Sequence, residues 1–235
     1  MNLPLNSLLD RNDPTENARY NMVQQQVRPW NVDGERLLDA LYTVRREDFT
    51  PPAHYSLAFM DVLVPLTEGA QSLDKGECMF QPRVEARMIN DVDVQPTDHV
   101  LEIGTGSGYS AALLSKLAKE VVTLELNAEL AEMARENLAD AGCDNVSVRV
   151  ADGSKDVLPE GPFDVIMLSG SVESIPEELL PHLKDGGRLS AIVGNEPVMR
   201  FTVVTKQGGS IVTKTPWDIV APRLHGFNTT NRFKF

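Results

Sequence analysis

The sequence predicts an α/β fold in which a mostly parallel central sheet carries helices on both faces and ends in an antiparallel hairpin. Apolar, strand-like segments alternate with helical patterns between about residues 99 and 193. A glycine-rich turn at residues 104–108 joins the first of these strands to a helix. Two apolar segments near the C-terminus flank residues 206–210, whose adjacent glycines are typical of a hairpin.

Two helices followed by loops are expected in the first third of the chain. A helix is predicted over residues 14–27, with Asp13 as its N-cap. Asp33 is expected to cap a second helix, whose leucines recur at helical spacing. Residues 45–82 are rich in Pro and Gly and are expected to be extended loops, and a further helix is expected over residues 83–90.

The alternating region accounts for the parallel part of the sheet. Its predicted strands are residues 99–103, 121–126, 146–150, 163–168 and 188–193. Its predicted helices are residues 109–119, 128–141 and about 176–183. Residues 201–205 and 211–216 are the predicted strands of the hairpin.

Composition limits the classes of partner. The 235 residues carry a net charge of −12, which disfavours a nucleic-acid partner because binding through phosphates needs a basic surface. Two cysteines do not provide a disulfide framework, and the four histidines lack the spacing of metal ligands, so no metal site is expected. With no signal peptide and no apolar run of about 20 residues, we expect a cytoplasmic protein that does not bind membranes. The oligomeric state stays open.

The glycine-rich turn is the most informative segment. A dinucleotide site requires G-x-G-x-x-G, but Tyr109 stands where the third glycine would fall, and no G-K-[ST] sequence indicates a phosphate-binding P-loop. The spacing E-x-G-x-G-x-G resembles motif I of class I methyltransferases, which use S-adenosylmethionine (SAM). The resemblance implies a SAM site; a glycine-rich turn of another α/β protein is the alternative. The residues implied around the amino acid part of SAM are Glu102, Gly104, Thr105, Gly106, Ser107 and Gly108.

Further candidates lie near the carboxyl ends of predicted strands, where open α/β sheets bind ligands. Glu125, next to Leu126, is placed to accept hydrogen bonds from both ribose hydroxyls. Asp152, in Asp152-Gly153, is placed to accept from the adenine amino group, with Ala151 or Gly153 leaving room for the ring; a plain Asp-Gly turn is the alternative. Ser169 is expected on the rim between cofactor and acceptor. The residues that complete the predicted cofactor site are Glu125, Leu126, Asp152, Gly153 and Ser169.

Beyond motif I, the chain resembles the protein-L-isoaspartate O-methyltransferases, which methylate the free carboxylate of isoaspartyl residues. The matching segments are residues 21–28 (NMVQQQVR), 44–51 (VRREDFTP), 58–66 (AFMDVLVPL), 152–153 (DG), 183–189 (LKDGGRL) and 217–222 (WDIVAP). Residues 28–30 and 197–199 look closest to a divergent bacterial branch of the family.

The resemblance implies a class I methyltransferase fold with a modified C-terminal strand order. It implies SAM as methyl donor, S-adenosylhomocysteine as product, and a damaged protein or peptide carrying isoaspartate as substrate. Residues 1–82 would be an N-terminal extension that forms part of the acceptor site, and residues 83–235 the SAM-binding domain of one compact unit. A peptide groove is expected between residues 70–82 and the C-terminal segment.

One segment departs from the family pattern. The active-site loop of the family reads G-Q-T-I-S-Q-P, whereas residues 76–82 of this chain read G-E-C-M-F-Q-P. Cys78 and Phe80 therefore replace the family's two hydroxyl side chains. An alternative alignment places Gln71-Ser72 on the family's Q-T.

The candidate acceptor-site residues are accordingly Ser72, Cys78 and Phe80. Phe80 removes a polar atom that would bind a carboxylate, and Ser72 or Lys75 would have to replace it. Cys78 is expected to be a small buried side chain and no nucleophile. Glu77 is expected to place a negative charge near an anionic acceptor.

Three functions follow from these patterns. The first is isoaspartyl O-methylation for protein repair. The second keeps SAM but uses a more apolar acceptor, because Cys78, Met79 and Phe80 would make an apolar wall. The third is a SAM-binding protein that has no acceptor chemistry. A dehydrogenase is a weaker reading because of the glycine spacing.

Overall fold

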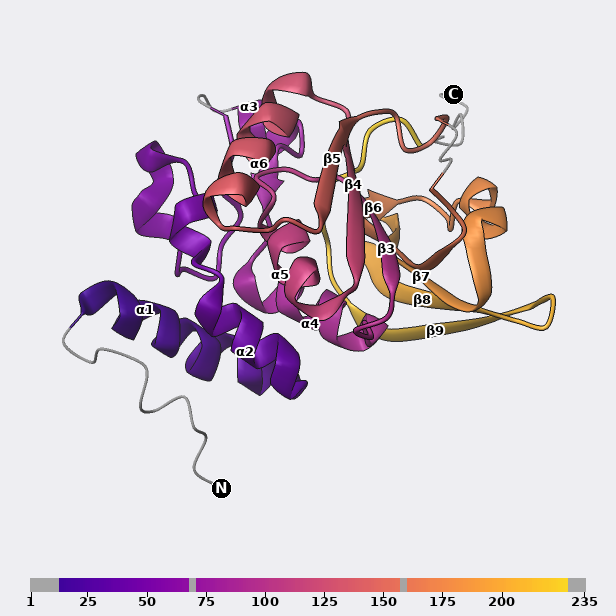
Figure 1. Ribbon diagram of the computed structural model, residues 1–235, viewed down its shortest axis with the longest axis horizontal. Helices are drawn as coiled ribbons and strands as arrows, with labels where there is room; N and C mark the ends of the chain where they lie inside the picture. Colours follow the sequence, from indigo (N-terminus) through magenta and orange to yellow (C-terminus); the bar gives the residue numbers. More distant parts are fainter. Residues whose placement is uncertain (1–12, 68–70, 157–159, 228–235) are drawn as a thin grey trace.

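The computed structural model describes residues 13–67, 71–156 and 160–227. Within these residues, the largest sheet has seven strands in the order β5-β4-β3-β6-β7-β8-β9 (Figure 1). The parallel strands are β5 (Val146–Val150), β4 (Glu120–Glu125), β3 (His99–Ile103), β6 (Phe163–Val172) and β7 (Leu183–Asn195), and the antiparallel strands are β8 (Val198–Gln207) and β9 (Ser210–Asp218). The predicted sheet with a C-terminal antiparallel hairpin is confirmed, and its last strands follow in chain order.

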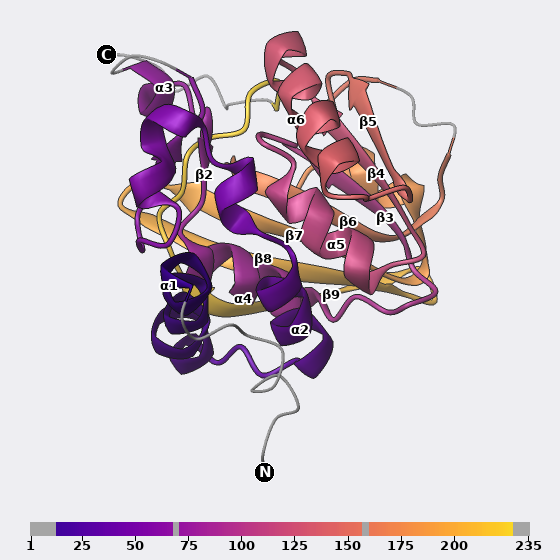
Figure 2. The ribbon, with the colours of Figure 1, turned by 60° about the vertical axis from the view of Figure 1, so that its left-hand side comes forward.

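The α-helices of the described region gather on one face of this sheet. α4 (Pro82–Val92), α5 (Tyr109–Leu117) and α6 (Ala128–Asp140) pack there, and Figure 2 shows α5 and α6 in front of the strands. Side chains alternate along each strand, so neighbouring Val100 and Leu101 of β3 enter different apolar clusters. The second face is covered by the 3-10 helix η6 (Glu177–His182) and by chain segments.

The N-terminal helices confirm one predicted cap and correct another. Asp13 caps α1 (Pro14–Met22), with its carboxylate accepting from Thr15 N at 2.8 Å, and helical turns continue as η2 (Val23–Val27) and η3 (Arg28–Trp30). The predicted cap of α2 (Glu35–Thr43) at Asp33 is wrong, because Gly34 is the N-cap. The Asn90 side chain of α4 accepts from Gly34 N, at 3.1 Å, and from Asp33 N, at 3.4 Å.

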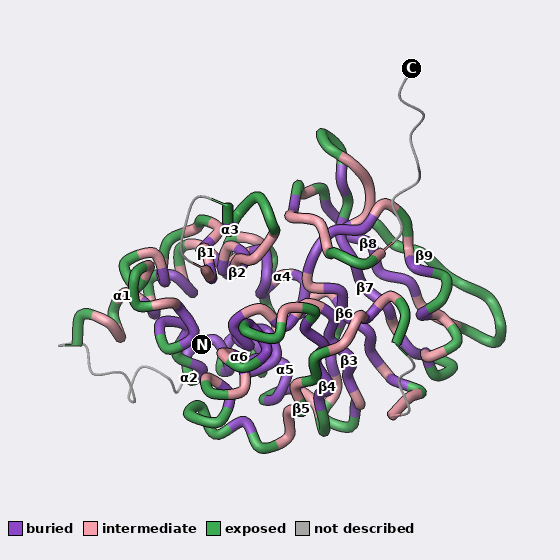
Figure 3. Tube along the Cα trace, turned by 90° about the horizontal axis from the view of Figure 1, so that it is seen from above, coloured by how far each residue is buried: buried purple, intermediate pink, exposed green. Residues whose placement is uncertain are grey.

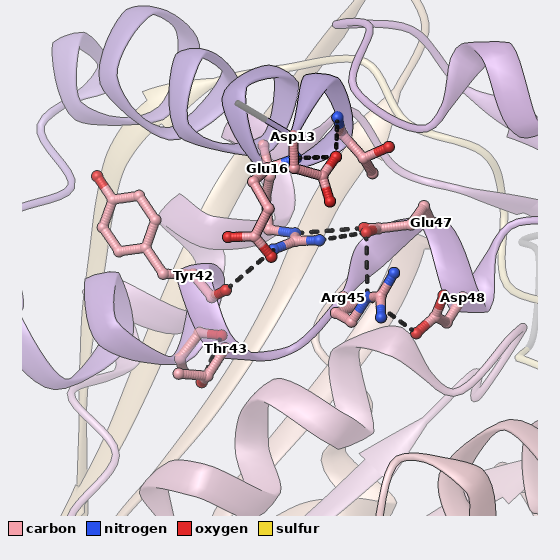
Figure 4. Close-up of polar contacts among 10 residues, drawn as sticks. Asp13, Glu16, Tyr42, Thr43, Arg45, Glu47 and Asp48 are labelled. Carbon is pink, nitrogen blue, oxygen red and sulfur yellow. Dashed lines mark hydrogen bonds and ion pairs between the residues drawn. The ribbon is translucent and has the colours of Figure 1, made fainter. Parts of the chain in front are cut away.

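The described residues between 45 and 82, which are 45–67 and 71–82, are more ordered than the predicted loops. They form η4 (Arg46–Phe49), η5 (Pro52–Leu57), β1 (Val64–Pro65), α3 (Gln71–Asp74) and β2 (Cys78–Met79), and β1 pairs antiparallel with β2. Glu47 forms ion pairs with Arg19 of α1 and with Arg45 (Figure 4). Burial of charged pairs, which the Pro and Gly content does not reveal, therefore fixes this segment to the helices.

β6 and β7 extend furthest beyond their predicted limits at a single end, and β8 and β9 also run longer than predicted. β6 runs through Ser169 and ends at Val172, with a register shift between Met167 and Ser171. Ser171 and Val172 still pair with β7, and Ser171 N also donates to Pro222 O at 2.8 Å, so β7 and the C-terminal segment together prolong the strand. β7 begins at Leu183, before the predicted Asp-Gly-Gly turn, because Leu183 pairs with Phe163 of β6. The register then shifts before the pair formed by Val165 and Arg188.

The edge strand β9 is exposed along most of its length, as Figure 3 shows for the far end of the β8–β9 hairpin. Its Lys214 and Pro216 are residue types that limit pairing with another sheet. Trp217 is the buried residue of β9 and stacks on Phe201. Across the described ranges, no helix is long and apolar enough to cross a membrane.

Candidate active site

The glycine turn lies between β3 and α5, at the carboxyl end of the parallel strands. Gly104 has a φ of +98° and Gly108 has a φ of +88°, which residues with a Cβ rarely adopt. A Cβ on Gly104 would lie 2.9 Å from Leu224 Cδ2 of the C-terminal segment. The turn is therefore tight and also closely approached, as a backbone that wraps a ligand must be.

Glu102 is fully buried beneath this turn. Its carboxylate accepts from Thr123 Oγ1 and from Ser169 Oγ, both at 2.8 Å. Thr105 Oγ1 lies 2.7 Å from the same Thr123 hydroxyl, which connects the turn to this network. Burial raises the pKa of Glu102 from 4.5 to about 7. The two predicted site residues Glu102 and Ser169 are thus brought together.

The raised pKa of Glu102 predicts a pH dependence of stability. The folded protein holds this proton more tightly than the unfolded chain, so the contribution is fully present below about pH 4.5 and is lost as the pH rises through about 7. Glu102→Gln, which stays neutral, is expected to lose less free energy of unfolding than the wild type between about pH 5 and about pH 8. Urea unfolding at both values measures this, and parallel pH profiles would contradict it.

Glu125 ends β4 and faces the glycine turn. Its carboxylate accepts from Gly106 N at 2.9 Å and from Asn127 N at 3.0 Å, so the two backbone groups fix its orientation. An ionised carboxylate has about four acceptor positions, which leaves capacity for two hydroxyl donors. The next residue, Leu126, is 51% exposed and offers an apolar surface beside it.

Asp152 and Gly153 follow β5. The Asp152 carboxylate accepts from Ser154 Oγ at 2.6 Å and from Lys155 Nζ at 2.7 Å, and the Lys155 hydrogen bond lowers the pKa of Asp152. A Cβ on Gly153 would lie 2.6 Å from Ile103 Cγ2, so this glycine makes room for a β3 side chain. Ser154 also donates to Gly226 O at 2.8 Å, which places the C-terminal segment against this loop.

The predicted acceptor segment lies against the glycine turn. Cys78, Met79 and Phe80 share a cavity of about 30 Å³ with the turn residues and with Ser169. Burial raises the pKa of the Cys78 thiol to about 12, which keeps it neutral. Phe80 is buried, and its carbonyl accepts from Arg46 Nη2 at 2.6 Å.

Ser72 and Glu77 organise the turn that precedes this segment. Ser72 is buried, and its hydroxyl donates to Glu77 O at 2.7 Å and accepts from Thr67 N at 3.2 Å. The Glu77 carboxylate accepts from Thr67 Oγ1 at 2.9 Å and from Asn127 Nδ2 at 3.1 Å. Asn127 also donates its backbone N–H to Glu125, so one residue links the acceptor segment to the predicted ribose acceptor.

A cavity of about 640 Å³ lies beside this site, between the α3 region and the C-terminal segment. Asp74 and Gly76 line one side, and Pro222 and Arg223 line the other. Ser171 of β6 also lines it, two residues beyond Ser169. The cavity thus occupies the position at which the peptide groove was expected.

Comparison with known proteins agrees with this geometry. The family model described as Protein-L-isoaspartate(D-aspartate) O-methyltransferase (PCMT) matches residues 17–220. The chain belongs to the protein-L-isoaspartate O-methyltransferase family.

Eight relatives in this isoaspartate methyltransferase family are 33–40% identical to the chain over the aligned residues. The protein-L-isoaspartate O-methyltransferase of Koribacter versatilis is 38% identical over 82% of this chain and 84% of its own. That of Methanoculleus marisnigri is 37% identical over 86% of this chain and 88% of its own.

Two solved structures of the isoaspartate methyltransferase family share the fold. One protein-L-isoaspartate O-methyltransferase has a TM-score of 0.75 at 23% identity, covering 90% of this chain and 66% of that one. A β-aspartate methyltransferase (PCMT) from Plasmodium falciparum, in complex with S-adenosyl-L-homocysteine, has a TM-score of 0.75 at 18% identity. The match covers 91% of this chain and 99% of that one.

The sequence did not predict the buried charged side chains beside the acceptor segment of this family member. Arg46 is completely buried and donates to Glu85 Oε2 at 2.8 Å, as well as to Phe80 O and Ala58 O. Burial raises the pKa of Glu85. The Arg46–Glu85 pair joins residues that are distant in the chain. The sequence signal that could have indicated buried charges here was the presence of Arg46 and Glu47 inside the family segment at residues 44–51.

Proposed function

We propose that this chain is a SAM-dependent O-methyltransferase that methylates the free carboxylate of isoaspartyl residues in damaged proteins. Membership of the isoaspartate methyltransferase family supports the reaction class. The observation that carries the proposal is the position of residues 78–80 against the glycine turn, beside a cavity large enough for a polypeptide segment. The net charge of −12 favours a protein over a nucleic acid as substrate.

The residues at the carboxyl ends of the strands fit SAM. Glu125 is held by two backbone N–H groups with acceptor capacity to spare for the ribose hydroxyls. Leu126 offers an exposed apolar surface for the adenine, and Asp152 offers a carboxylate for its amino group. The residues proposed to hold SAM are Glu102, Gly104, Thr105, Gly106, Ser107, Gly108, Glu125, Leu126, Asp152, Gly153 and Ser169.

Methyl transfer requires little of the chain beyond positioning the methyl donor and the acceptor. Bound SAM supplies a methyl group on a sulfonium, which passes to a carboxylate oxygen as the carbon–sulfur bond breaks and leaves an ester and a neutral thioether. The acceptor is already an anion, so no residue has to remove a proton, which agrees with the neutral Cys78 thiol. Met79 and Phe80 exclude water, and the acceleration comes from holding the reacting atoms in line.

The N-terminal region, residues 1–82, is proposed to contribute the acceptor side of the site. Cys78 and Phe80 line it, while Ser72 holds the turn before them through Glu77 O and Thr67 N. Glu77 is turned to Thr67 and Asn127, and these hydrogen bonds offset the cost of placing its charge near an anionic acceptor.

A second candidate acceptor is a more apolar molecule. The buried Phe80 ring and the neutral Cys78 favour it, because neither side chain would bind a carboxylate strongly. A SAM-binding protein without acceptor chemistry is the third possibility that the altered segment raises.

An acceptor comparison tests the proposal. Purified protein, labelled SAM and two peptides of identical sequence, one with isoaspartate and one with aspartate, are incubated together. We expect base-labile methyl ester on the isoaspartyl peptide alone. Equal or absent labelling of both peptides, with SAM still bound, would contradict the proposal, and S-adenosylhomocysteine formation on apolar acceptors would then favour the second candidate.

A further inference from the structure

Arg223 differs from the other buried or half-buried arginines of the described region because its guanidinium forms no ion pair with a described carboxylate. Each of the others that is buried or half-buried forms an ion pair with a carboxylate; these are Arg19, Arg46, Arg83, Arg87, Arg135 and Arg188. Arg223 is half-buried, and its Nη2 donates to two neutral acceptors, Gly194 O at 2.9 Å and Asn195 Oδ1 at 3.0 Å. Among the residues that the structure describes, no carboxylate therefore forms an ion pair with it.

The second guanidinium nitrogen of Arg223 strengthens this point. Nη1 is shielded from solvent, and none of the described residues accepts a hydrogen bond from it. Leaving a sheltered charged donor unpaired is costly, and such groups in native proteins call for an explanation. Because Nη1 has almost no accessible surface, a ligand in the cavity would meet the charge of the guanidinium and not this nitrogen.

The backbone around Arg223 is firmly placed. Pro222 O accepts from Ser171 N at 2.8 Å, and Leu224 N donates to Ser171 O at 2.9 Å, so β6 holds the residues on both sides. Arg223 O lies 3.2 Å from the position of a Cβ on Gly76, next to the acceptor segment. The side chain therefore lines a defined part of the 640 Å³ cavity.

We propose that Arg223 is a specificity-determining residue that recognises an acidic side chain of the substrate polypeptide near its isoaspartyl residue. The proposal rests on the proposed function and adds a substrate class to it. Arg223 directly follows the family segment at residues 217–222, on the cavity side of the C-terminal segment. Guanidinium groups pair with carboxylates through charge-assisted hydrogen bonds, which fits such a ligand.

Two carboxylates also line the cavity, and they act against an acidic ligand. Asp74 and Glu196 are both exposed, so water and salt screen their repulsion. Arg223 is half-buried and its Nη1 is shielded, so its attraction is screened less. The balance favours Arg223 for a carboxylate that reaches the wall of the cavity.

Matched isoaspartyl peptides test the inference. All have acetylated and amidated ends and carry Glu, Gln or Lys at one position on either side of the isoaspartate. The wild type is expected to bind a Glu peptide about tenfold more tightly than its Gln counterpart for at least one position. Fluorescence anisotropy with the enzyme loaded with S-adenosylhomocysteine measures binding, and kcat/KM measures transfer.

Variants assign the preference to Arg223. Arg223→Gln is expected to abolish the Glu-over-Gln ratio while changing binding of the Gln peptide less than about twofold, and Arg223→Lys to retain part of the ratio. Arg135→Gln removes the same charge from α6, away from the cavity, and is expected to keep the wild-type ratio.

Three outcomes would overturn the inference. They are equal binding of Glu and Gln peptides by the wild type, an Arg223→Gln variant that weakens both equally, or an Arg135→Gln variant that loses the ratio as well. Failure of the proposed function is distinguishable, because the wild type would then methylate none of the isoaspartyl peptides although anisotropy still reports their binding.

Discussion

Replacing Glu125 with Ala is expected to weaken binding of SAM and S-adenosylhomocysteine about 100-fold or more. The carboxylate orients the turn through Gly106 N and caps the start of α6 through Asn127 N, and it is the proposed acceptor for both ribose hydroxyls. Hydrogen bonds to a charged group contribute about 1.5–3 kcal/mol each, so loss of two gives this magnitude. Isothermal titration calorimetry with S-adenosylhomocysteine measures the change.

The matched control for this variant is Glu129→Ala. Glu129 lies in the first turn of α6, close in sequence to Glu125, and is exposed. It is expected to leave the dissociation constant within about twofold and to change the free energy of unfolding by less than about 0.5 kcal/mol. A Glu125→Ala variant that also binds within about threefold of the wild type would exclude Glu125 from the cofactor site.

Removing the buried charge of Arg46 is expected to give the largest loss of stability. Arg46→Met leaves Glu85 buried without its partner and frees the carbonyls of Phe80 and Ala58. Breaking a buried ion pair costs about 3–5 kcal/mol, which corresponds to a fall in Tm of about 6–20 °C for a chain of this size. Urea unfolding monitored by circular dichroism measures the free energy.

A double variant separates the ion pair from simple loss of packing. Arg46→Met combined with Glu85→Leu removes both charges, so no uncompensated carboxylate stays buried, and it is expected to recover part of the stability lost in the single variant. A double variant that is no more stable than Arg46→Met would show that the charge of Glu85 is not the source of the loss.

The strand ends that carry the proposed cofactor residues were predictable because their signals are local. The glycine turn, the carboxylate at the end of β4 and the Asp-Gly after β5 are each specified by a few consecutive residues at a strand end. The strands β3 and β5 were predicted with the limits that the structure shows. Local patterns of this kind need no knowledge of distant contacts.

The parts that differ depend on contacts between distant segments. Asp33 carries a good capping side chain, but the side chain of Asn90 in α4 accepts the hydrogen bond from the backbone N–H of Gly34 instead. β6 continues past Ser169 because its last residues pair with β7 and because Pro222 and Leu224 hydrogen-bond to Ser171. In each case a tertiary contact overrides the local propensity of the segment.

The acceptor side was least predictable for the same reason. The position of Phe80 is set by Arg46 and by the pairing of β2 with β1, and the Glu77 carboxylate is oriented by Asn127. None of these contacts follows from spacing. The family resemblance located the segment, and the structure supplied its surroundings.

A crystal structure with both S-adenosylhomocysteine and an isoaspartyl peptide would test the central claim most directly. We expect the glycine turn and Glu125 to hold the nucleoside, and the free isoaspartyl carboxylate to point at the sulfur between Cys78 and Phe80. A pocket in which the Phe80 ring fills that position, with the peptide carboxylate bound elsewhere, would contradict the account.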